Sequence, residues 1–181
     1  MVSGDTLTCA GKTYRCAAGR GGIVPASAKR EGDGGTPAGC WLLRECWYRP
    51  DRLPPPETAL PLRVLHPEDC WCDDSGHALY NRHMTIPALV PPPLIPPPER
   101  GGPGGGVPRS FERLWREDAL YDLIVPLGYN DDPIIPGKGS AIFLHVATAD
   151  YASTEGCVAL RKEDLLSVLK VASILTPIII S

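Results

Sequence analysis

The sequence lacks any apolar segment that could cross a bilayer as a helix. Its longest stretch without a charge, from Met84 to Pro98, is broken by prolines, and the C-terminal run SILTPIII is too short. The N-terminal stretch MVSGDTLTCAGKTYRC has neither the basic start nor the apolar centre of a signal peptide. The sequence therefore predicts no membrane span. No signal peptide is visible, so either a leader has been removed or the chain carries none.

A clustered basic excess is also missing. Eighteen Lys and Arg residues against 21 Asp and Glu residues give a formal net charge of −3, and the basic residues are scattered along the chain. Nucleic-acid-binding domains usually show a basic cluster, so we expect no nucleic-acid partner. Hydrophobic residues make up 43% and charged residues 22% of the 181 positions, which is ordinary globular usage. This length suits one well-buried core, and we expect a single domain over residues 1–181.

Cysteine, by contrast, is abundant: the chain has seven, at positions 9, 16, 40, 46, 70, 72 and 157. An odd number leaves at least one thiol unpaired in a monomer. Two interpretations stay open. Six cysteines could form three disulfides and leave the seventh free to react, or the cysteines could be reduced thiols buried as small hydrophobic side chains.

Short strands separated by turns dominate the pattern, so the predicted fold class is mainly β. The segments with strand-like composition are residues 6–10 and 12–17, which form a hairpin across Ala10-Gly11, and residues 40–48, 60–65, 120–127, 141–147 and 178–180. Two short helices are expected. SFERLWRED (residues 110–118) has a serine able to cap and apolar residues three and four apart, and residues 162–171 have one apolar and one charged face.

Residues 87–108 contain nine prolines and five glycines. No packed element survives that density, so we interpret this segment as an exposed Pro/Gly-rich loop inserted into the domain. It is also a candidate contact site for another protein, because Pro-rich segments are common recognition elements. A linker between two domains is the alternative.

The candidate chemistry lies near the C-terminus. Cys157 follows Gly156 in YASTEGCVAL, and His145 ends the apolar run SAIFLHVA twelve positions earlier. A cysteine nucleophile needs a base within hydrogen-bonding reach and donors for the oxyanion that forms after attack. A nearby imidazolium would lower the thiol pKa from its ordinary ~8.5 and supply the thiolate. A buried core thiol and a satisfied histidine at the end of a strand are the alternatives.

The stretch GSAIFLHVATADYASTEGCVAL resembles the signature of the L,D-transpeptidase catalytic domain (YkuD-type), in which a histidine after a buried strand precedes a Ser/Thr-x-Gly-Cys turn. EGDGGTPAG (residues 31–39) looks like the Thr-Pro-x-Gly segment of that family. WCDDSGHALYNR (residues 71–82) and RLWREDALYDLIVPLGYN (residues 113–130) look like segments of its single-domain bacterial branch. The chain departs from the common motif at two positions. Glu155 stands where a histidine is usual, and Ala159 where an arginine is frequent, with Arg161 the nearest substitute.

The resemblance implies a β-sandwich and a ping-pong acyl transfer on peptidoglycan stem peptides, donor and acceptor, without a metal or an organic cofactor. Cys157 would be the nucleophile and His145 the base, with its ring oriented by the backbone carbonyl of Val146. The N–H groups of Gly156 and Cys157 would hold the oxyanion. A periplasmic or cell-envelope location follows from this function. Two other functions stay open: an L,D-carboxypeptidase or other peptidoglycan hydrolase on the same scaffold, and a non-catalytic cell-wall binding module.

Three further groups of residues are candidates for binding. His66, Cys70, Cys72, His77 and His83 could hold a structural zinc, although Cys-x-Cys is a less usual spacing than Cys-x2-Cys, and a disulfide or buried thiols are the preferred interpretation. The acidic residues at positions 68, 69, 73 and 74 read as a solvated loop, with a contact to a cationic part of the stem peptide as the alternative. Residues 80–82 and the arginine at position 116 are candidates to line a substrate groove, and packing and surface salt bridges explain them equally well.

Overall fold

The structure is a computed structural model that describes residues 1–86 and 107–181. Within these residues it has fourteen strands and one helix, so the fold is mainly β, as the sequence predicts. The expected Pro/Gly-rich loop at residues 87–108 lies, except for its last two residues, outside the described residues.

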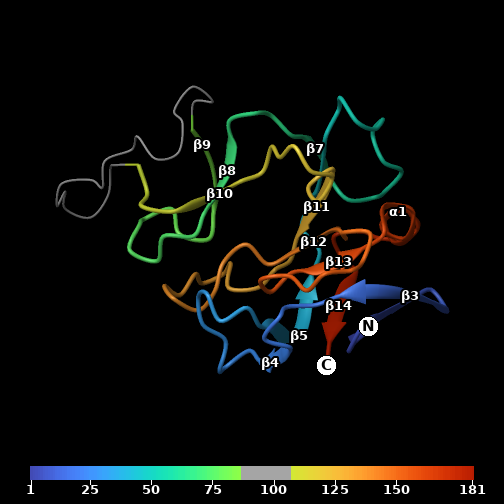
Figure 1. The fold of residues 1–181 in the computed structure, drawn as a ribbon, viewed down its shortest axis with the longest axis horizontal. Helices are drawn as coiled ribbons and strands as arrows, with labels where there is room; N and C mark the ends of the chain where they lie inside the picture. The colour runs from blue at the N-terminus through green and yellow to red at the C-terminus, as the bar shows by residue number, and fades with distance from the viewer. Residues whose placement is uncertain (87–106) are drawn as a thin grey trace.

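One sheet has eleven strands and carries most of the chain. Its strands, in spatial order, are β4 (Ile23–Pro25), β5 (Thr36–Leu42), β14 (Pro177–Ile180), β1 (Val2–Ser3), β2 (Thr6–Cys9), β3 (Lys12–Ala17), β13 (Val158–Leu160), β12 (Phe143–Val146), β11 (Leu123–Pro126), β6 (Cys46–Tyr48) and β7 (Leu62–Val64). The termini lie side by side because Val2 of β1 pairs with Ile180 of β14 (Figure 1).

A second sheet of three strands, in the order β10 (Phe111–Arg113), β8 (Asp69–Cys72) and β9 (His83–Thr85), stands apart from the termini (Figure 1). The helix α1 (Lys162–Leu169) follows β13 directly and buries Leu165, Val168 and Leu169.

The large sheet folds over one hydrophobic core. Side chains from both halves of its strand order, such as Leu7 of β2, Leu144 of β12 and Ile180 of β14, belong to the same buried cluster, together with the apolar face of α1. This arrangement is the sandwich that the sequence predicts. Burying these strands and the helix against one another removes their apolar faces from water, which is the main stabilising term of such a domain.

The strands β11, β12 and β13 are buried on both faces. Alternate residues enter the main core, and the residues between them face a second cluster that includes Trp47, Phe143 and Cys157. This is why these strands are nearly continuous apolar runs in the sequence. The second face lies toward the three-stranded sheet, since Trp71 of β8 packs edge-on against Phe143 of β12 at 5.1 Å between ring centroids.

Most expected elements are confirmed. The hairpin at Ala10-Gly11 forms with positive φ at both turn residues (48° and 75°), as the right-handed strand twist favours. The helix expected at residues 162–171 is α1. The expected single strand at residues 40–48 is two strands, β5 and β6, which have different neighbours.

The helix expected at residues 110–118 is wrong. Residues 111–113 form strand β10, which pairs antiparallel with β8 so that Glu112 lies opposite Trp71. Ser110 does not cap a helix, because its hydroxyl is hydrogen-bonded to the side chain of Asp73. Pairing with a strand far away in sequence has overridden a helix-like apolar spacing.

Candidate active site

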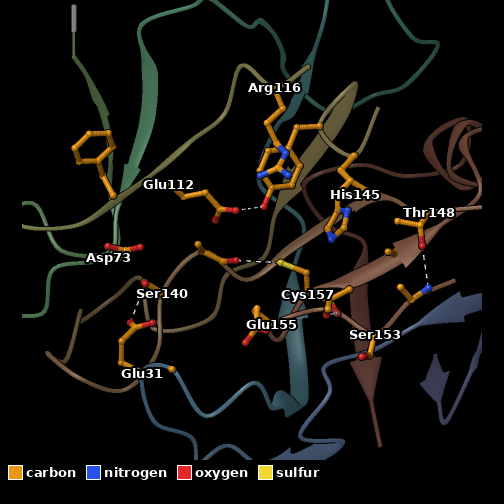
Figure 2. Close-up of a pocket in the computed structure, with 18 residues that line it drawn as sticks. Glu31, Asp73, Glu112, Arg116, Ser140, His145, Thr148, Ser153, Glu155 and Cys157 are labelled. Atoms are coloured by element: carbon orange, nitrogen blue, oxygen red, sulfur yellow. Dashed lines mark hydrogen bonds between the residues drawn. The ribbon is translucent and has the colours of Figure 1, made fainter. Parts of the chain in front are cut away.

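A cavity of about 570 Å³ lies between the three-stranded sheet and the second face of the large sheet. The large sheet contributes His145 and Ala159 and, from the turn before β13, Cys157, whereas Glu112 comes from β10 and Asp73 follows β8. Figure 2 shows these side chains around the same space, with Cys157 and His145 on one side and Glu112 and Asp73 on the other. The cavity is the setting in which the candidate residues meet.

Strand register places Cys157 and His145 on the same face. In the parallel pair of β12 and β13, Leu144 lies opposite Val158 and His145 opposite Ala159. Leu144 and Val158 point into the main core, so their neighbours Cys157 and His145 point to the opposite face, toward the cavity. Ala159 is the residue directly beside His145, and its single methyl group leaves space above the strand next to the imidazole.

The imidazole of His145 is held in one orientation. Its Nδ1 donates to the carbonyl of Val146 at 2.8 Å, which leaves Nε2 as the unprotonated nitrogen. The ring also meets the edge of the Tyr121 ring at 5.4 Å between centroids. Burial lowers the pKa of His145 to about 4, and the positive charge of Arg116 acts in the same direction, whereas the Val146 carbonyl opposes both. At neutral pH His145 is therefore a neutral base.

The thiol of Cys157 is buried and hydrogen-bonded. It donates to the carbonyl of Ala141 at 3.1 Å and accepts from the N–H of Phe143 at 3.3 Å. Burial raises the pKa of Cys157 to about 12, and the negative charge of Glu112 adds to this effect. The expectation that an imidazolium lowers the thiol pKa is thus wrong for this state of the site, because burial keeps both the thiol and the imidazole neutral.

The turn that presents Cys157 is tied together by Thr154. The Thr154 hydroxyl donates to the carbonyl of Cys157 at 2.7 Å and accepts from the N–H of Gly156 at 3.1 Å. Gly156 has a φ of 136°, a conformation that side chains disfavour, and a Cβ there would lie 2.9 Å from the carbonyl oxygen of Gly35. One of the two expected oxyanion donors, the Gly156 N–H, is therefore engaged within the turn.

The opposite wall of the cavity is acidic, and the sequence interpretation missed most of it. Glu112 accepts a short hydrogen bond from the hydroxyl of Tyr121, and Glu31 accepts one from Ser140 at 2.8 Å. Oδ1 of Asp73 is enclosed and has no hydrogen-bond partner. The alternative interpretation of Asp73, as a contact for a cationic part of the substrate, is compatible with this position. No local signal marked Glu112, since the expected helix concealed its strand.

Of the other residues that the sequence suggests for the site, some line the cavity and others lie outside it. Arg116 lines the cavity, where its guanidinium is paired with Asp118 at 2.6 Å. The hydroxyl of Tyr80 donates to Glu31 from behind the cavity wall. Arg161 is exposed at the start of α1 and does not line the cavity, so it is no substitute for the arginine of the common motif.

Glu155 is exposed at the cavity rim and bonded to Arg20 at 2.8 Å. Beyond the cavity, Asn81 and Arg82 line a separate hollow together with Trp71.

The residues of the candidate zinc site make other contacts. His83 binds Asp69 at 2.7 Å, and Nδ1 of His77 lies 3.9 Å from the sulfur of Cys72. Across residues 1–86 and 107–181, no three His, Cys, Asp or Glu side chains gather as a metal site. All seven cysteines fall within this range, and all are free thiols, five of them buried, rather than three disulfides and one thiol.

The fold and the cavity define a mainly β domain in which a strand-end histidine and a cysteine after a glycine line one cavity. The model of the YkuD family, the L,D-transpeptidase catalytic domain, matches residues 9–180 of the chain. The chain belongs to this family, as the resemblance in its sequence predicts. Searches of curated proteins and of solved structures gave no match. No helix in the described part of the chain is long and apolar enough to cross a membrane.

Proposed function

We propose that this domain is a cysteine-dependent L,D-transpeptidase that acts on peptidoglycan stem peptides at the cell envelope. The observation that carries the proposal is the register of β12 and β13, which directs Cys157 and His145 from one face of the sheet into one cavity. Membership of the L,D-transpeptidase family supports the reaction class.

In the first half-reaction, Cys157 attacks the carbonyl of an L-residue that precedes a D-residue in the donor stem. The thiol proton passes to Nε2 of His145 as the S–C bond forms, and the Val146 carbonyl stabilises the resulting imidazolium through Nδ1–H. The oxyanion is held by the N–H of Cys157, and by that of Gly156 once it gives up its bond to Thr154. The C–N bond then breaks, His145 returns the proton to the leaving amine, and a thioester remains.

In the second half-reaction, an amine from a neighbouring stem attacks the thioester. His145 removes a proton from the attacking nitrogen and passes it to the departing sulfur, which restores the free thiol. Water in place of the amine would give a carboxypeptidase. Both reactions use the same nucleophile and base, so the products distinguish them.

The thioester step is tested by the intact mass of the protein after incubation with meropenem, a β-lactam that acylates nucleophilic cysteines. We expect one added drug mass on the native protein and none on Cys157→Ala. His145→Gln should acylate at least a hundredfold more slowly, in line with the ~10²–10⁴-fold contribution of a positioned base. Cys46→Ala, which removes another buried thiol, is the matched control and should acylate normally.

The reaction itself is tested with defined disaccharide tetrapeptides, analysed by mass spectrometry. Cross-linked dimers indicate transfer, and trimmed monomers indicate hydrolysis. A native protein that neither acylates nor produces either product, although folded, would refute the catalytic proposal and favour a non-catalytic cell-wall binding module.

A further inference from the structure

Glu112 occupies an unusual position for a carboxylate. It lies on β10, at the wall of the cavity that faces Cys157, and one of its oxygens is bonded to the buried hydroxyl of Tyr121. The Tyr121 ring in turn packs edge-on against His145. Figure 2 shows Glu112 on the same side of this space as Asp73, across from Cys157. Neither half-reaction described above uses this pair.

The charges around Glu112 leave a place for a cation. The titratable groups that influence it are Tyr121, Arg116, Asp73 and Cys157. Arg116 is the one permanent cation among them, and it is engaged with Asp118 through two nitrogens, at 2.6 and 2.9 Å. Asp73 adds a second negative charge and has an enclosed oxygen, Oδ1, without a partner. Two carboxylates on one wall repel each other, and a bound cation would relieve the repulsion.

On the basis of the proposed function, we propose that Glu112, held in place by Tyr121, binds the ammonium group of the acceptor and receives its first proton. The ligand class is a primary ammonium at the end of a side chain, with N–H groups that reach the carboxylate of Glu112 on the cavity wall. This site would favour an amine over water as the group that resolves the thioester.

Each proton released by the acceptor in this step has an assigned destination. An acceptor ammonium has to lose one proton before its nitrogen can attack, and a second proton as the amide forms. Glu112 takes the first and releases it to solvent after the product leaves, whereas His145 transfers the second to the sulfur. Burial raises the pKa of Glu112, which makes this carboxylate a better proton acceptor than an exposed one.

The same site is coupled to the nucleophile. In the empty cavity the negative charge of Glu112 raises the pKa of Cys157. A bound ammonium, or protonation of Glu112, cancels this contribution and makes the sulfur easier to ionise. Removing the charge by Glu112→Gln should therefore increase the reactivity of the free thiol while it weakens acceptor binding, two effects of opposite direction that simple loss of structure would not produce.

The first experiment measures alkylation of Cys157 by neutral iodoacetamide at pH 8, with and without 50 mM Nα-acetyl-lysine amide as a primary-ammonium probe. We expect the probe to accelerate alkylation at least threefold in the native protein and not in Glu112→Gln, whose rate without probe is already raised at least threefold. A full pKa unit would correspond to about tenfold. Glu57→Gln, at an exposed surface pair with Lys170, is the matched control and should behave as native.

The second experiment compares cross-linked and hydrolysed products from defined muropeptides. Glu112→Gln should lower the ratio of dimer to trimmed monomer at least tenfold while meropenem acylation persists. Tyr121→Phe, which keeps the ring against His145, should lower it to a smaller extent. An unchanged ratio, no effect of the probe on the native thiol, or a parallel fall of alkylation and transfer in Glu112→Gln would overturn the proposal. An effect of the probe in a protein without transfer activity would support the ammonium site and refute the proposed reaction.

Discussion

Replacing Gly156 by alanine is the sharpest test of how the turn presents Cys157. The φ of 136° lies in a region that residues with a Cβ rarely adopt, at a cost of about 1–3 kcal/mol. The new Cβ would also stand 2.9 Å from the carbonyl oxygen of Gly35 and 3.2 Å from Cδ1 of Ile142. Relieving such overpacking costs about 1–3 kcal/mol more. The sum, about 2–6 kcal/mol, would lower the Tm by about 4–24 °C in a domain of this size.

The matched control is Gly11→Ala in the N-terminal hairpin. Gly11 also has positive φ (75°), but a Cβ there meets nothing within 4 Å, so only the backbone cost of about 1–2 kcal/mol applies. We expect Gly156→Ala to unfold at lower temperature than Gly11→Ala, and to lose meropenem acylation that Gly11→Ala retains. Equal Tm values for the two variants, with acylation intact in both, would show that the turn has no tight constraint and would refute this reasoning.

Two further predictions concern buried charges. Because the pKa of His145 falls to about 4 in the folded state from 6.5, the unfolded chain binds the additional proton between these values, so stability should rise by roughly 3 kcal/mol from pH 4 to pH 6.5. Urea unfolding across this range should show a weaker rise in His145→Gln than in the surface control His66→Gln, and equal slopes would contradict the assignment. Lys29→Met leaves Asp33 without its 2.6 Å partner and should cost about 1.5–3 kcal/mol, the contribution of a hydrogen bond to a charged group, because Lys29 is only 2% exposed and Asp33 keeps its backbone N–H donors. The exposed control Lys170→Met should cost less than about 1 kcal/mol, and a similar loss in both variants would contradict the role of burial.

The local parts of the fold could be predicted from the sequence because their signals are local. The Ala10-Gly11 turn, the apolar runs of β11 and β12, and the amphipathic helix α1 each carry their own pattern within a few residues. The order of His145, Gly156 and Cys157 along the chain was likewise enough to suggest a nucleophile and its base.

The part of the site that could not be predicted depends on pairing across the chain. Glu112 lies in the cavity because β10 pairs with β8, about forty residues earlier in the chain, and Asp73 follows that same strand. In the sequence, the spacing of Phe111, Leu114 and Trp115 favoured a helix. That expectation gave no reason to place the side chain of Glu112 in the cavity. The pairing of distant strands therefore decides which carboxylates lie near the cysteine. No short segment of the sequence carries that information.

The buried pair also decides how the nucleophile has to be activated. With the pKa of Cys157 near 12 and that of His145 near 4, moving the proton from sulfur to nitrogen in the empty site costs about 11 kcal/mol before the attraction of the two charges. Even two unit charges as close as about 4 Å attract each other by only about 4 kcal/mol at an effective dielectric constant near 20. A thiolate–imidazolium pair is therefore not the resting state, in contrast to exposed reactive cysteines. The proton transfer has to accompany formation of the S–C bond, when the negative charge moves to the oxyanion and meets the N–H of Cys157. Because this burial keeps the thiol neutral until a carbonyl is bound, the rate of acylation depends strongly on a bound substrate.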